Sequence, residues 1–513
     1  MTLLARIVST SHAVARHTSR TAKVAELAAC LRSLEPSEIE TGVLYLSGET
    51  TQGKSGIGST ALEAASADPP ATTGTLTIGD VDNALTAVAQ IRGTGAASRR
   101  IAALRALFAQ ATSLERAFVA RLVLGELRQG ALGGLMNDAI AAASYLPPAL
   151  VRRAAMYARH LGAVARVALS EGRTGLEQFQ LEILSPIAPM LAQTAADVGE
   201  ALQQLQGQVA FEWKMDGARI QVHRSGDTVR VYSRSLNDVT DSVPEVVETV
   251  RDLSSQDLIL EGEVIAFTAE RRPQPFQVTM RRFGRRLDIE ASRAQLPLEA
   301  YFFDCLRLDG RSLADQPTRA RYQSLDTVVP AERRMPRLIT RSEQEAGAFY
   351  DAALVAGHEG VMAKALDAPY EAGNRGASWL KIKRAHTLDL VVLAAEWGHG
   401  RRTGKLSNLH LGALDPASGG YVMLGKTFKG LTDAVLEWQT RQLLARETRR
   451  DDWTVHVRPE LVVEIAFSDL QASPRYPGGL ALRLARVKRY RDDKQPAEAD
   501  TMESVRRIYA AQT

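Results

Sequence analysis

The segment of this chain best suited to covalent chemistry contains a lysine placed among carboxylates. Lys214 is followed by Asp216, Gly217 and Arg219, and Glu212 lies two residues before it. In an extended segment the period of two places Glu212, Lys214 and Asp216 on one side of the chain. A lysine amine becomes a nucleophile once it loses its proton, and nearby cations or a bound metal ion favour that loss by lowering its pKa. A surface ladder of salt bridges on a hairpin is the alternative interpretation.

Further charged and aromatic residues follow the lysine along the chain. Lysine side chains are cations that can stabilise the charge on phosphate oxygens. Candidates for these cations are Lys364, Lys381 and Lys383. Glu263 and Glu359 offer the hard oxygen ligands that Mg²⁺ prefers, and Phe303 offers an aromatic face for a base. Taken singly, Phe303 could equally be a core residue and Glu263 a charge at a strand edge.

A second phosphate-binding pattern lies nearer the N-terminus. Residues 48–55 match the P-loop pattern in full, with Lys54 at its key position. Such a loop needs a preceding strand and a helix that begins at the Lys-Ser pair. Residues 43–46 could be the strand, but two glycines follow the pair and oppose a helix. We therefore expect a long surface loop over residues 48–77, with a P-loop ATPase as the alternative of a different class.

Apolar periodicity divides the chain into three regions. In residues 1–205 apolar side chains recur at intervals of three and four, which predicts an all-α domain. Residues 206–386 change to a period of two mixed with helical stretches, which predicts an α+β domain with antiparallel strands. Residues 387–513 contain short alternating runs typical of a β-barrel, for which an OB-fold is the candidate. Pro186 and Pro189 indicate an extended linker before the second region.

The composition excludes several classes of protein. The chain has 513 residues, of which 45% are hydrophobic and 24% are charged, as expected for a globular protein of several domains. No apolar run is long enough to predict a membrane span. Cys30 and Cys305 are too few for a zinc finger or a disulfide framework and are expected in the core. The net charge of +4 is compatible with a phosphate-rich partner without requiring one.

The first 25 residues have two interpretations. They contain no Asp or Glu but several Arg, Ser and Thr, a composition shared with mitochondrial transit peptides. Leu4, Ile7, Val8 and Val14 nevertheless follow helical spacing, and the pattern continues into the next apolar stretch. We favour a first helix of a bacterial cytoplasmic protein and keep the transit peptide as the alternative.

The segment around Lys214 reads KMDGAR, and it resembles the nucleophile motif of the covalent nucleotidyltransferases, specifically of the ATP-dependent DNA ligases. Later segments resemble the other motifs of that family in the same order, from an SR pair through LEGE, YFFD, EGVMAK and WLKIK to LRLAR and DDK. Two segments depart from the usual pattern, because LEGE and LRLAR stand where the family more often has LDGE and LRFPR. Neither departure removes a residue that we assign to chemistry.

This resemblance implies an enzyme that seals 5′-phosphate/3′-hydroxyl nicks in duplex DNA during replication, repair and recombination. It implies that Lys214 carries AMP, which then passes to the DNA 5′-phosphate before the 3′-hydroxyl displaces it. ATP is the implied nucleotide and Mg²⁺ the implied metal, held by Glu263 and Glu359, with Mn²⁺ able to substitute. The residues implied to bind the nucleotide are Glu212, Arg219, Arg234, Glu263, Phe303, Lys364, Arg375, Lys381, Lys383, Arg483, Arg486 and Lys494.

The first region distinguishes among covalent-lysine enzymes. A helical domain there argues against messenger RNA capping enzymes and RNA ligases, and the two cysteines argue against NAD-dependent ligases. Residues 125–132 and the linker at 185–190 resemble the DNA-binding domain of the larger ligases, which implies backbone contacts in the minor groove without sequence preference. The implied partner is nicked duplex DNA encircled by a monomer, in the cytoplasm at the bacterial nucleoid and away from membranes. A DNA-binding protein without catalysis is the remaining alternative.

The resemblance also implies movement of the third region. During adenylation it would lie closed over the nucleotide, so that Arg483, Arg486 and Lys494 orient the leaving pyrophosphate. It would then swing away about a hinge near residues 383–386 and let DNA take its place.

Overall fold

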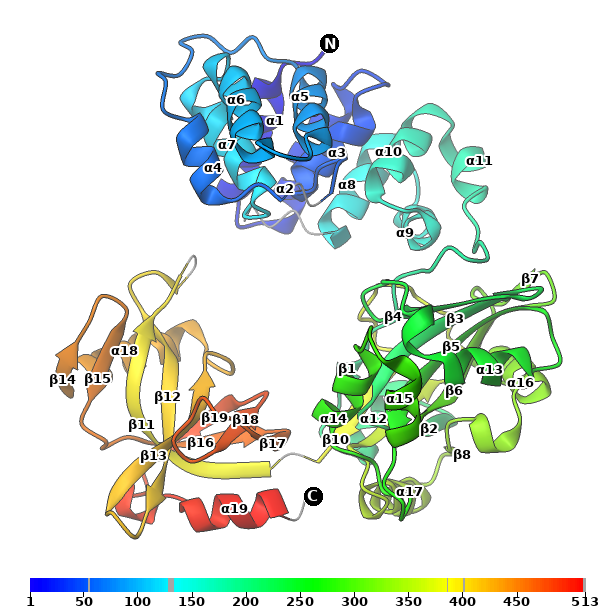
Figure 1. The fold of residues 1–513 in the computed structure, drawn as a ribbon, viewed down its shortest axis with the longest axis vertical. Coiled ribbons are helices and arrows are strands. Elements are labelled where there is room, and N and C mark those ends of the chain that lie inside the picture. Colours follow the sequence, from blue (N-terminus) through cyan, green and yellow to red (C-terminus); the bar gives the residue numbers. More distant parts are fainter. Residues whose placement is uncertain (54–55, 128–132, 385, 400–401, 511–513) are drawn as a thin grey trace.

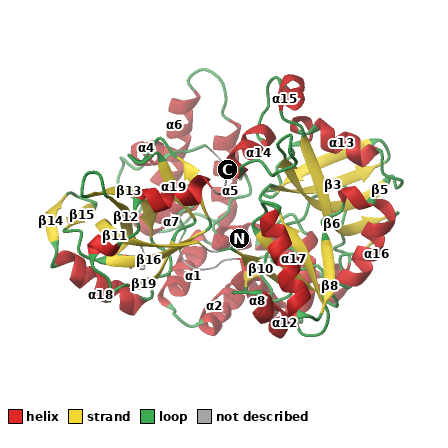
Figure 2. Cartoon of the chain, turned by 90° about the horizontal axis from the view of Figure 1, so that it is seen from below, coloured by secondary structure: helices red, strands yellow, loops and turns green. Residues whose placement is uncertain are grey.

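The chain forms three parts, which we call the helical, middle and C-terminal parts. A computed structural model describes residues 1–53, 56–127, 133–384, 386–399 and 402–510. Helices gather at the top of Figure 1, and two strand-containing parts lie below, the middle part on the right and the C-terminal part on the left. Seen from below, these two parts lie on opposite sides of the view (Figure 2).

Helices fill the first part, as the periodicity predicts. Helix α1 (Leu4–Arg16) buries Leu4, Ile7 and Val14, so the first apolar pattern is a packed helix. Helices α5 (Ile78–Gln90) and α7 (Ser113–Val123) begin at capping boxes, which satisfy backbone N–H groups at their first turns. The other helices are α2 (Arg20–Arg32), α3 (Ile39–Ser47), α4 (Ser59–Ala65), α6 (Ala96–Ala109), α8 (Gly133–Ser144), α9 (Pro148–Tyr157), α10 (Leu161–Ser170) and α11 (Gly172–Glu177).

The region of the P-loop pattern differs from the sequence prediction. Residues 43–46 lie inside the helix α3. The strand that a P-loop needs before it is therefore missing at this position. Lys54 lies outside the described residues. The long loop predicted for residues 48–77 is wrong in part, because α4 lies within it and buries Leu62 and Ala65. Two apolar residues at a spacing of three are enough to give this short helix a buried face.

Two sheets form the middle part. The first has the strand order β1-β10-β9-β2-β8, and the second has the order β4-β3-β5-β6-β7. The strands are β1 (Gln193–Thr194), β2 (Val209–Lys214), β3 (Ala218–Ser225), β4 (Thr228–Ser233), β5 (Asp257–Ala266), β6 (Leu298–Leu308), β7 (Arg311–Ser312), β8 (Arg337–Thr340), β9 (Gly360–Ala365) and β10 (Trp379–Lys383). Helices and turns between them are α12 (Val198–Leu205), η1 (Thr240–Ser242), α13 (Pro244–Arg251), α14 (Phe276–Phe283), α15 (Ile289–Gln295), α16 (Thr318–Val328), η2 (Ala331–Arg333) and α17 (Glu343–Val355).

Strands β3 and β4 form a hairpin, in which Ser225 faces Thr228 across the turn. Strand β2 precedes it in the sequence but belongs to the other sheet. Gly217 lies at this crossing from one sheet to the other. A Cβ there would approach the carbonyl oxygen of Val264 to 2.3 Å, so only glycine lets the two sheets meet so closely.

Separate apolar clusters stabilise the middle part. One lies under the second sheet, and another joins the first sheet to α12 and α17. Residues 193–205, placed in the first region from the sequence, pack here: β1 pairs with β10, and Val198 and Ala201 are buried against the first sheet. A further cluster lies between the sheets and combines Phe303 and Trp379 with Ile187 and Met190 of the linker.

The C-terminal part is built on an antiparallel sheet with the order β13-β12-β11-β15-β14, and β16 pairs with both β11 and β19. The alternating runs in the sequence are therefore strands, as predicted. A separate hairpin, β17–β18, completes it. The elements are β11 (His386–Trp397), β12 (Leu406–Asp415), β13 (Gly420–Thr427), α18 (Asp433–Leu444), β14 (Glu447–Arg450), β15 (Thr454–Val457), β16 (Val462–Phe467), β17 (Asp469–Ala472), β18 (Leu480–Arg483), β19 (Arg486–Tyr490), η4 (Pro496–Glu498) and α19 (Met502–Ala510).

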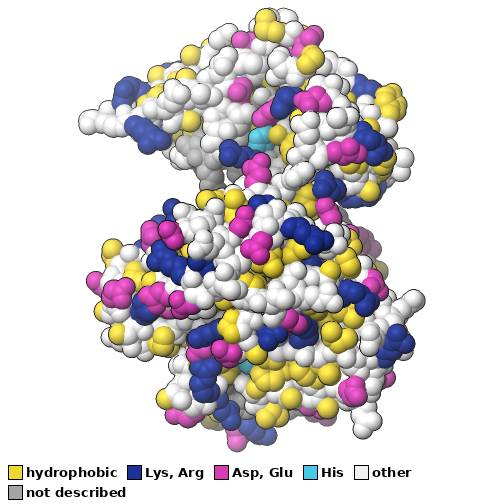
Figure 3. Space-filling view, turned by 90° about the vertical axis from the view of Figure 1, so that its right-hand side faces the viewer, with side chains coloured by type: hydrophobic (Ala, Val, Ile, Leu, Met, Phe, Trp, Pro, Cys, Tyr) yellow, Lys and Arg dark blue, Asp and Glu magenta, His cyan; other side chains and the backbone are white. Residues whose placement is uncertain are grey.

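On the face drawn in Figure 3, a narrow waist joins the helical part to the rest, and acidic and basic side chains are interspersed. Both cysteines are buried and free, as expected from the sequence. Within the described ranges, every helix is too short or too polar to traverse a bilayer.

Candidate active site

Strand pairing brings the predicted nucleophile to its carboxylate. Lys214 ends β2 opposite Gly360, the first residue of β9, and Lys383 ends β10 on the other side of Gly360. Glu359 precedes β9, and its backbone N–H donates to the carbonyl oxygen of Lys214 at 3.0 Å. Its carboxylate forms an ion pair with the Lys214 amine and a second one with Lys383 at 2.6 Å. Two lysines that lie 169 positions apart in the sequence thus share one glutamate.

The charges around Lys214 keep it protonated in this arrangement. Burial would lower its pKa, but Glu359, Glu263 and Asp216 outweigh burial and raise the pKa above the ordinary value. Burial also raises the pKa of Glu263 to about 7, against the opposing charges of Lys214 and Arg219. Nearby cations, which the sequence predicts to lower the pKa of Lys214, are outweighed. The carboxylates are closer, and they dominate.

Lys381 and Lys383 show the opposite direction. Burial, followed by repulsion from Lys383, Arg375 and Lys214, lowers the pKa of Lys381. Burial and the charge of Lys214 likewise lower the pKa of Lys383. This crowding of cations at one sheet end is a setting for phosphate oxygens, which would relieve the repulsion.

Two buried aromatic rings, those of Phe303 and Trp379, lie near the lysine cluster with the cations of Lys364 and Arg219 over them, and we call these four side chains the aromatic pocket. The Lys364 amine lies 4.5 Å from the ring centre of Phe303 and 4.2 Å from that of Trp379. It pairs with Glu212 at 2.5 Å, and both side chains are almost fully buried. The Arg219 guanidinium lies over the same two rings at 5.4 and 5.5 Å. The segments with these residues come from both sheets, so the pocket exists only in the folded chain.

Two buried donors in this pocket are available to a ligand. Trp379 Nε1 and Arg219 Nε are buried and, within the part of the chain that the structure describes, have no hydrogen-bond partner. Buried polar groups are normally satisfied, so orphaned donors indicate a place for an external acceptor. A purine nucleotide has ring and sugar acceptors of this kind and an aromatic face for Phe303. The aromatic pocket is therefore the candidate place for the base and sugar of a nucleotide.

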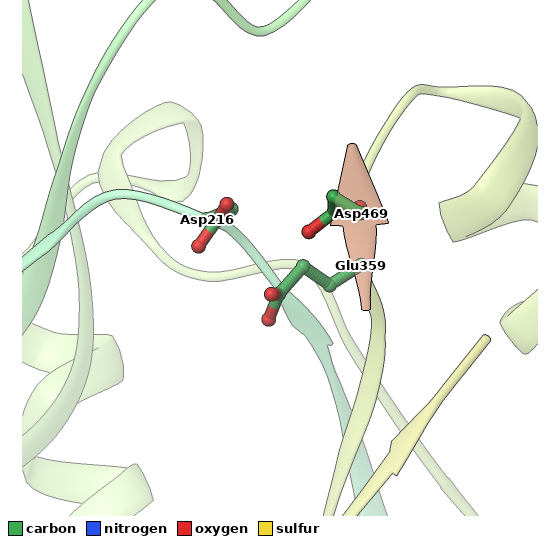
Figure 4. Close-up of side chains that lie close together, drawn as sticks. All are labelled: Asp216, Glu359 and Asp469. Carbon is green, nitrogen blue, oxygen red and sulfur yellow. The ribbon is translucent and has the colours of Figure 1, made fainter. Parts of the chain in front are cut away.

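Three carboxylates converge beside Lys214. Oxygens of Asp216, Glu359 and Asp469 lie within 4.8 Å of one another, and Asp469 reaches in from strand β17 of the C-terminal part (Figure 4). Glu359 belongs to the metal pair predicted from the sequence. Glu263, the other member, lies close enough to influence the charge of Lys214 but outside this group of three.

Arg483 connects the C-terminal part to the lysine site. Its guanidinium pairs with Asp216 at 2.5 Å and with Asp469 at 3.4 Å, and it lies 4.2 Å from the ring centre of Phe276. A hydrogen bond of 3.1 Å from Gln277 to Gln471 supports the same contact. The β17–β18 hairpin therefore meets the middle part at the candidate active site.

The other predicted cations lie further out. Arg234 is exposed but lines a small crevice with Arg219. Arg375 is exposed and close enough to repel Lys381. Arg486 is exposed on β19, and Lys494 pairs with Asp389 at 2.6 Å within the C-terminal part. The structure thus brings Arg483, and not Arg486 or Lys494, into contact with the residues around Lys214.

Sequence reasoning missed two residues of the site. Trp379 was read only as part of the WLKIK motif, and its indole proves to be a wall of the pocket. Asp469 follows an apolar strand in a segment that resembles no motif, and only the packing of the C-terminal part brings it near Lys214. A tryptophan that starts an alternating strand was a usable signal, whereas Asp469 offered none.

Comparison with known proteins agrees with this geometry. Residues 189–383 match the ATP dependent DNA ligase domain, residues 402–494 the C terminal region of the same family, and residues 51–141 the DNA ligase N terminus. A probable DNA ligase of Anaeromyxobacter dehalogenans (strain 2CP-C) is 59% identical over 510 residues, which is 99% of each chain. One of Sorangium cellulosum is 54% identical and covers 99% of this chain and 95% of its own.

The solved structure named Pmar-Lig_PreS3 is 18% identical and superposes with a TM-score of 0.62 over 94% of this chain and 99% of its own, so it shows the fold. The full-length relatives, together with a lysine held among carboxylates beside an aromatic pocket, establish that this chain belongs to the family of ATP-dependent DNA ligases, which seal nicks through an adenylate intermediate.

Proposed function

We propose that Lys214 is the residue that carries AMP and that this chain seals 5′-phosphate/3′-hydroxyl nicks in duplex DNA. The observation that carries the proposal is the position of Lys214. It lies at the end of β2, paired with Glu359 and adjacent to a pocket with an aromatic wall and free buried donors. The alternatives of a P-loop ATPase and of a non-catalytic DNA-binding protein provide no role for this lysine.

The reaction requires the free amine of Lys214, so its ammonium first releases a proton to water. Despite burial, the two lysines hold the pKa of Glu359 down to about 2, and this carboxylate positions the ammonium until then. The free amine attacks the α-phosphate of ATP, a P–N bond forms, and pyrophosphate leaves. The 5′-phosphate of the nick then takes the AMP from Lys214, and the 3′-hydroxyl displaces AMP to close the strand. Lys381 and Lys383, whose ammonium groups are crowded, stabilise the charge on the phosphate oxygens.

We assign the nucleotide contacts as follows. Phe303 and Trp379 flank the base, Glu212 and Lys364 lie at the inner wall, and Arg219 and Glu263 face the sugar. We assign the outer cations to contacts with DNA or with the triphosphate, which they make when the parts of the chain move. These cations are Arg234, Arg375, Arg486 and Lys494. ATP rather than NAD is the substrate, in agreement with the family.

Magnesium, with manganese as a substitute, fits the carboxylates beside Lys214. Asp216, Glu359 and Asp469 provide oxygens within 4.8 Å of one another, and Glu263 is nearby. Hard oxygen donors of this kind suit a small divalent cation. Such an ion supplies charge neutralisation for the phosphates.

We assign one domain to each of the three parts of the chain. We propose a helical DNA-binding domain (residues 1–205), an adenylation domain (206–386) and an OB-fold barrel domain (387–513), with residues 193–205 packing against the second. We propose that a monomer encircles nicked DNA with these three parts and binds it without sequence preference. Residues 128–132 of the implied DNA-binding segment and Ala385 of the hinge lie outside the described residues. We place the enzyme in the bacterial cytoplasm, at the nucleoid.

The test uses ATP labelled at the α-phosphate, with labelled GTP as the competing nucleotide. Deadenylated protein should retain label from ATP on a denaturing gel, and Lys214→Ala should retain none. Lys488→Ala is the matched control, because this lysine is also paired with a glutamate but lies half exposed on the C-terminal part. Absence of label on the wild-type chain, or label on Lys214→Ala, contradicts the assignment. Sealing of a nicked duplex by the labelled protein completes the test.

A further inference from the structure

The linker that enters the middle part is held by side chains rather than by a sheet. Within residues 184–190, the backbone N–H of Leu184 donates to His223 Nδ1 at 2.9 Å, and its carbonyl accepts from the Tyr232 hydroxyl at 2.9 Å. The N–H and carbonyl of Ile187 both bond the side-chain amide of Gln221, at 2.9 and 3.2 Å. We call these residues the strap.

Gln221 also reaches the nucleotide pocket. Its Nε2 donates to Glu261 at 3.4 Å, and Glu261 accepts from Arg219 at 2.7 Å. Arg219 in turn lies over the rings of Phe303 and Trp379. A continuous series of buried hydrogen bonds therefore runs from Gln221 through Glu261 to the arginine that faces the nucleotide.

The orientation of the Gln221 amide is fixed at its other end. His223 Nδ1 accepts from Leu184, so the ring proton lies on Nε2 and is donated to Gln221 Oε1 at 2.9 Å. Oε1 also accepts from Ile187, which leaves Nε2 to donate to the Ile187 carbonyl and to Glu261. Gln221 and His223 are almost fully buried, so a reversed amide would leave several buried groups unpaired.

The strap itself closes the series at Arg219. The Met190 carbonyl accepts from Arg219 at 2.7 Å, and the Met190 N–H donates to the Tyr370 hydroxyl at 2.9 Å. Ile187 and Met190 also belong to the apolar cluster that contains Phe303 and Trp379. The guanidinium is thus held from two directions, by Glu261 and by the strap.

We propose that Gln221 is a positioning residue for ATP binding, which orients Arg219 over the aromatic pocket by way of Glu261 and locks the strap in the same network. This rests on the proposed nucleotide site and adds to it a residue that touches no nucleotide. Without the hydrogen bond from Gln221 to Glu261, Arg219 keeps its charge but is no longer held in one orientation. The affinity for ATP should therefore fall, while the rate of the chemical step at Lys214 should stay the same.

The test measures ATP affinity and adenylation separately. The Kd of ATP is measured by calorimetry on deadenylated protein in EDTA, and KM and kcat of Lys214 labelling are measured with magnesium. Gln221→Met, close in size but without polar atoms, should raise both Kd and KM about tenfold and leave kcat within about twofold. Tyr232→Phe is the matched control, because it removes a strap hydrogen bond of 2.9 Å outside the series and should leave Kd unchanged.

A double-mutant cycle tests the route through Glu261. Gln221→Met and Glu261→Gln act on one series of contacts, so together they should raise Kd no further than the larger single change does. If Gln221→Met does not fold by circular dichroism, Gln221→Asn serves instead, because it keeps a neutral amide but is one methylene shorter, which takes the amide N–H out of reach of Glu261, already at 3.4 Å. A Kd equal to wild type, a rise shared by Tyr232→Phe, or additive effects would each overturn the proposal. Failure of wild-type protein to bind ATP would instead refute the proposed function.

Discussion

The buried pair of Lys364 and Glu212 allows a quantitative test of the pocket. Lys364 is 1% exposed and Glu212 2%, and their charges are 2.5 Å apart. Lys364→Met removes the cation and leaves a buried carboxylate without its counter-charge, which costs about 3–5 kcal/mol. For a domain of this size each kcal/mol corresponds to about 2–4 °C, so the melting temperature of the middle part should fall by about 6–20 °C.

A double variant shows whether the loss of stability comes from the unpaired charge or from poorer packing. Glu212→Leu combined with Lys364→Met replaces the pair by apolar side chains and should recover at least half of the lost stability, although ATP use is still lost. Arg319→Ala is the control, since its pair with Asp367 is largely exposed and contributes at most about 1 kcal/mol. Scanning calorimetry of the full chain provides the measurement. A single variant as stable as the control, or a double variant no better than the single one, would refute this reasoning.

Other predictions concern the domain contact and two titrating groups. Arg483→Ala removes the pair with Asp216, and should slow self-adenylation at least tenfold while the sealing of pre-adenylated nicks stays within about twofold; equal loss of both steps would contradict it. Burial lowers the pKa of His223 to about 3, so the stability held by its neutral form is lost as pH falls from 6.5 towards 3. Wild type should therefore lose about 2 kcal/mol more than His223→Asn between pH 7 and pH 5, as measured by urea unfolding, and parallel curves would exclude this. Despite burial, which opposes the shift, hydrogen bonds led by that of Lys426 lower the pKa of Glu396 to about 2. Glu396→Gln should lower the free energy of unfolding by about 1–2 kcal/mol at pH 7, and the difference from wild type should disappear as pH falls from 4.5 to 2. A difference that stays constant over this pH range would disprove the prediction.

The structure brings together charged residues that the sequence singled out one by one, because Glu359 pairs with both Lys214 and Lys383. Alternation along a strand predicts which side chains share a face, and their chemical roles stay predictions. Strand register then determines that these residues meet, and it depends on pairing between distant segments. The position of Asp469 depends on how the C-terminal part packs, which no local pattern encodes.

Prediction of secondary structure from the sequence was weakest where the apolar pattern covers only a few residues. Helix α4 has few apolar residues in a stretch rich in Gly and Ser, and its stability comes from burying Leu62 and Ala65 rather than from propensity. The strap shows the converse, because its prolines correctly indicated an extended segment. Nothing in the strap sequence revealed that Gln221 and His223 would satisfy its backbone, since their side chains come from a strand that follows it.

Charge balance explains why the C-terminal part contributes to a site located mainly in the middle part. Asp216, Glu359 and Asp469 lie within 4.8 Å of one another, a repulsive arrangement for three carboxylates. Lys214 and Lys383 balance the charge of Glu359. Asp216 obtains its close counter-charge from Arg483, which also pairs with Asp469. The C-terminal part thus contributes one carboxylate and the cation that offsets it. The charge arrangement around Lys214 is therefore complete only while the β17–β18 hairpin contacts the middle part, because withdrawal of Arg483 leaves Asp216 without its close counter-charge.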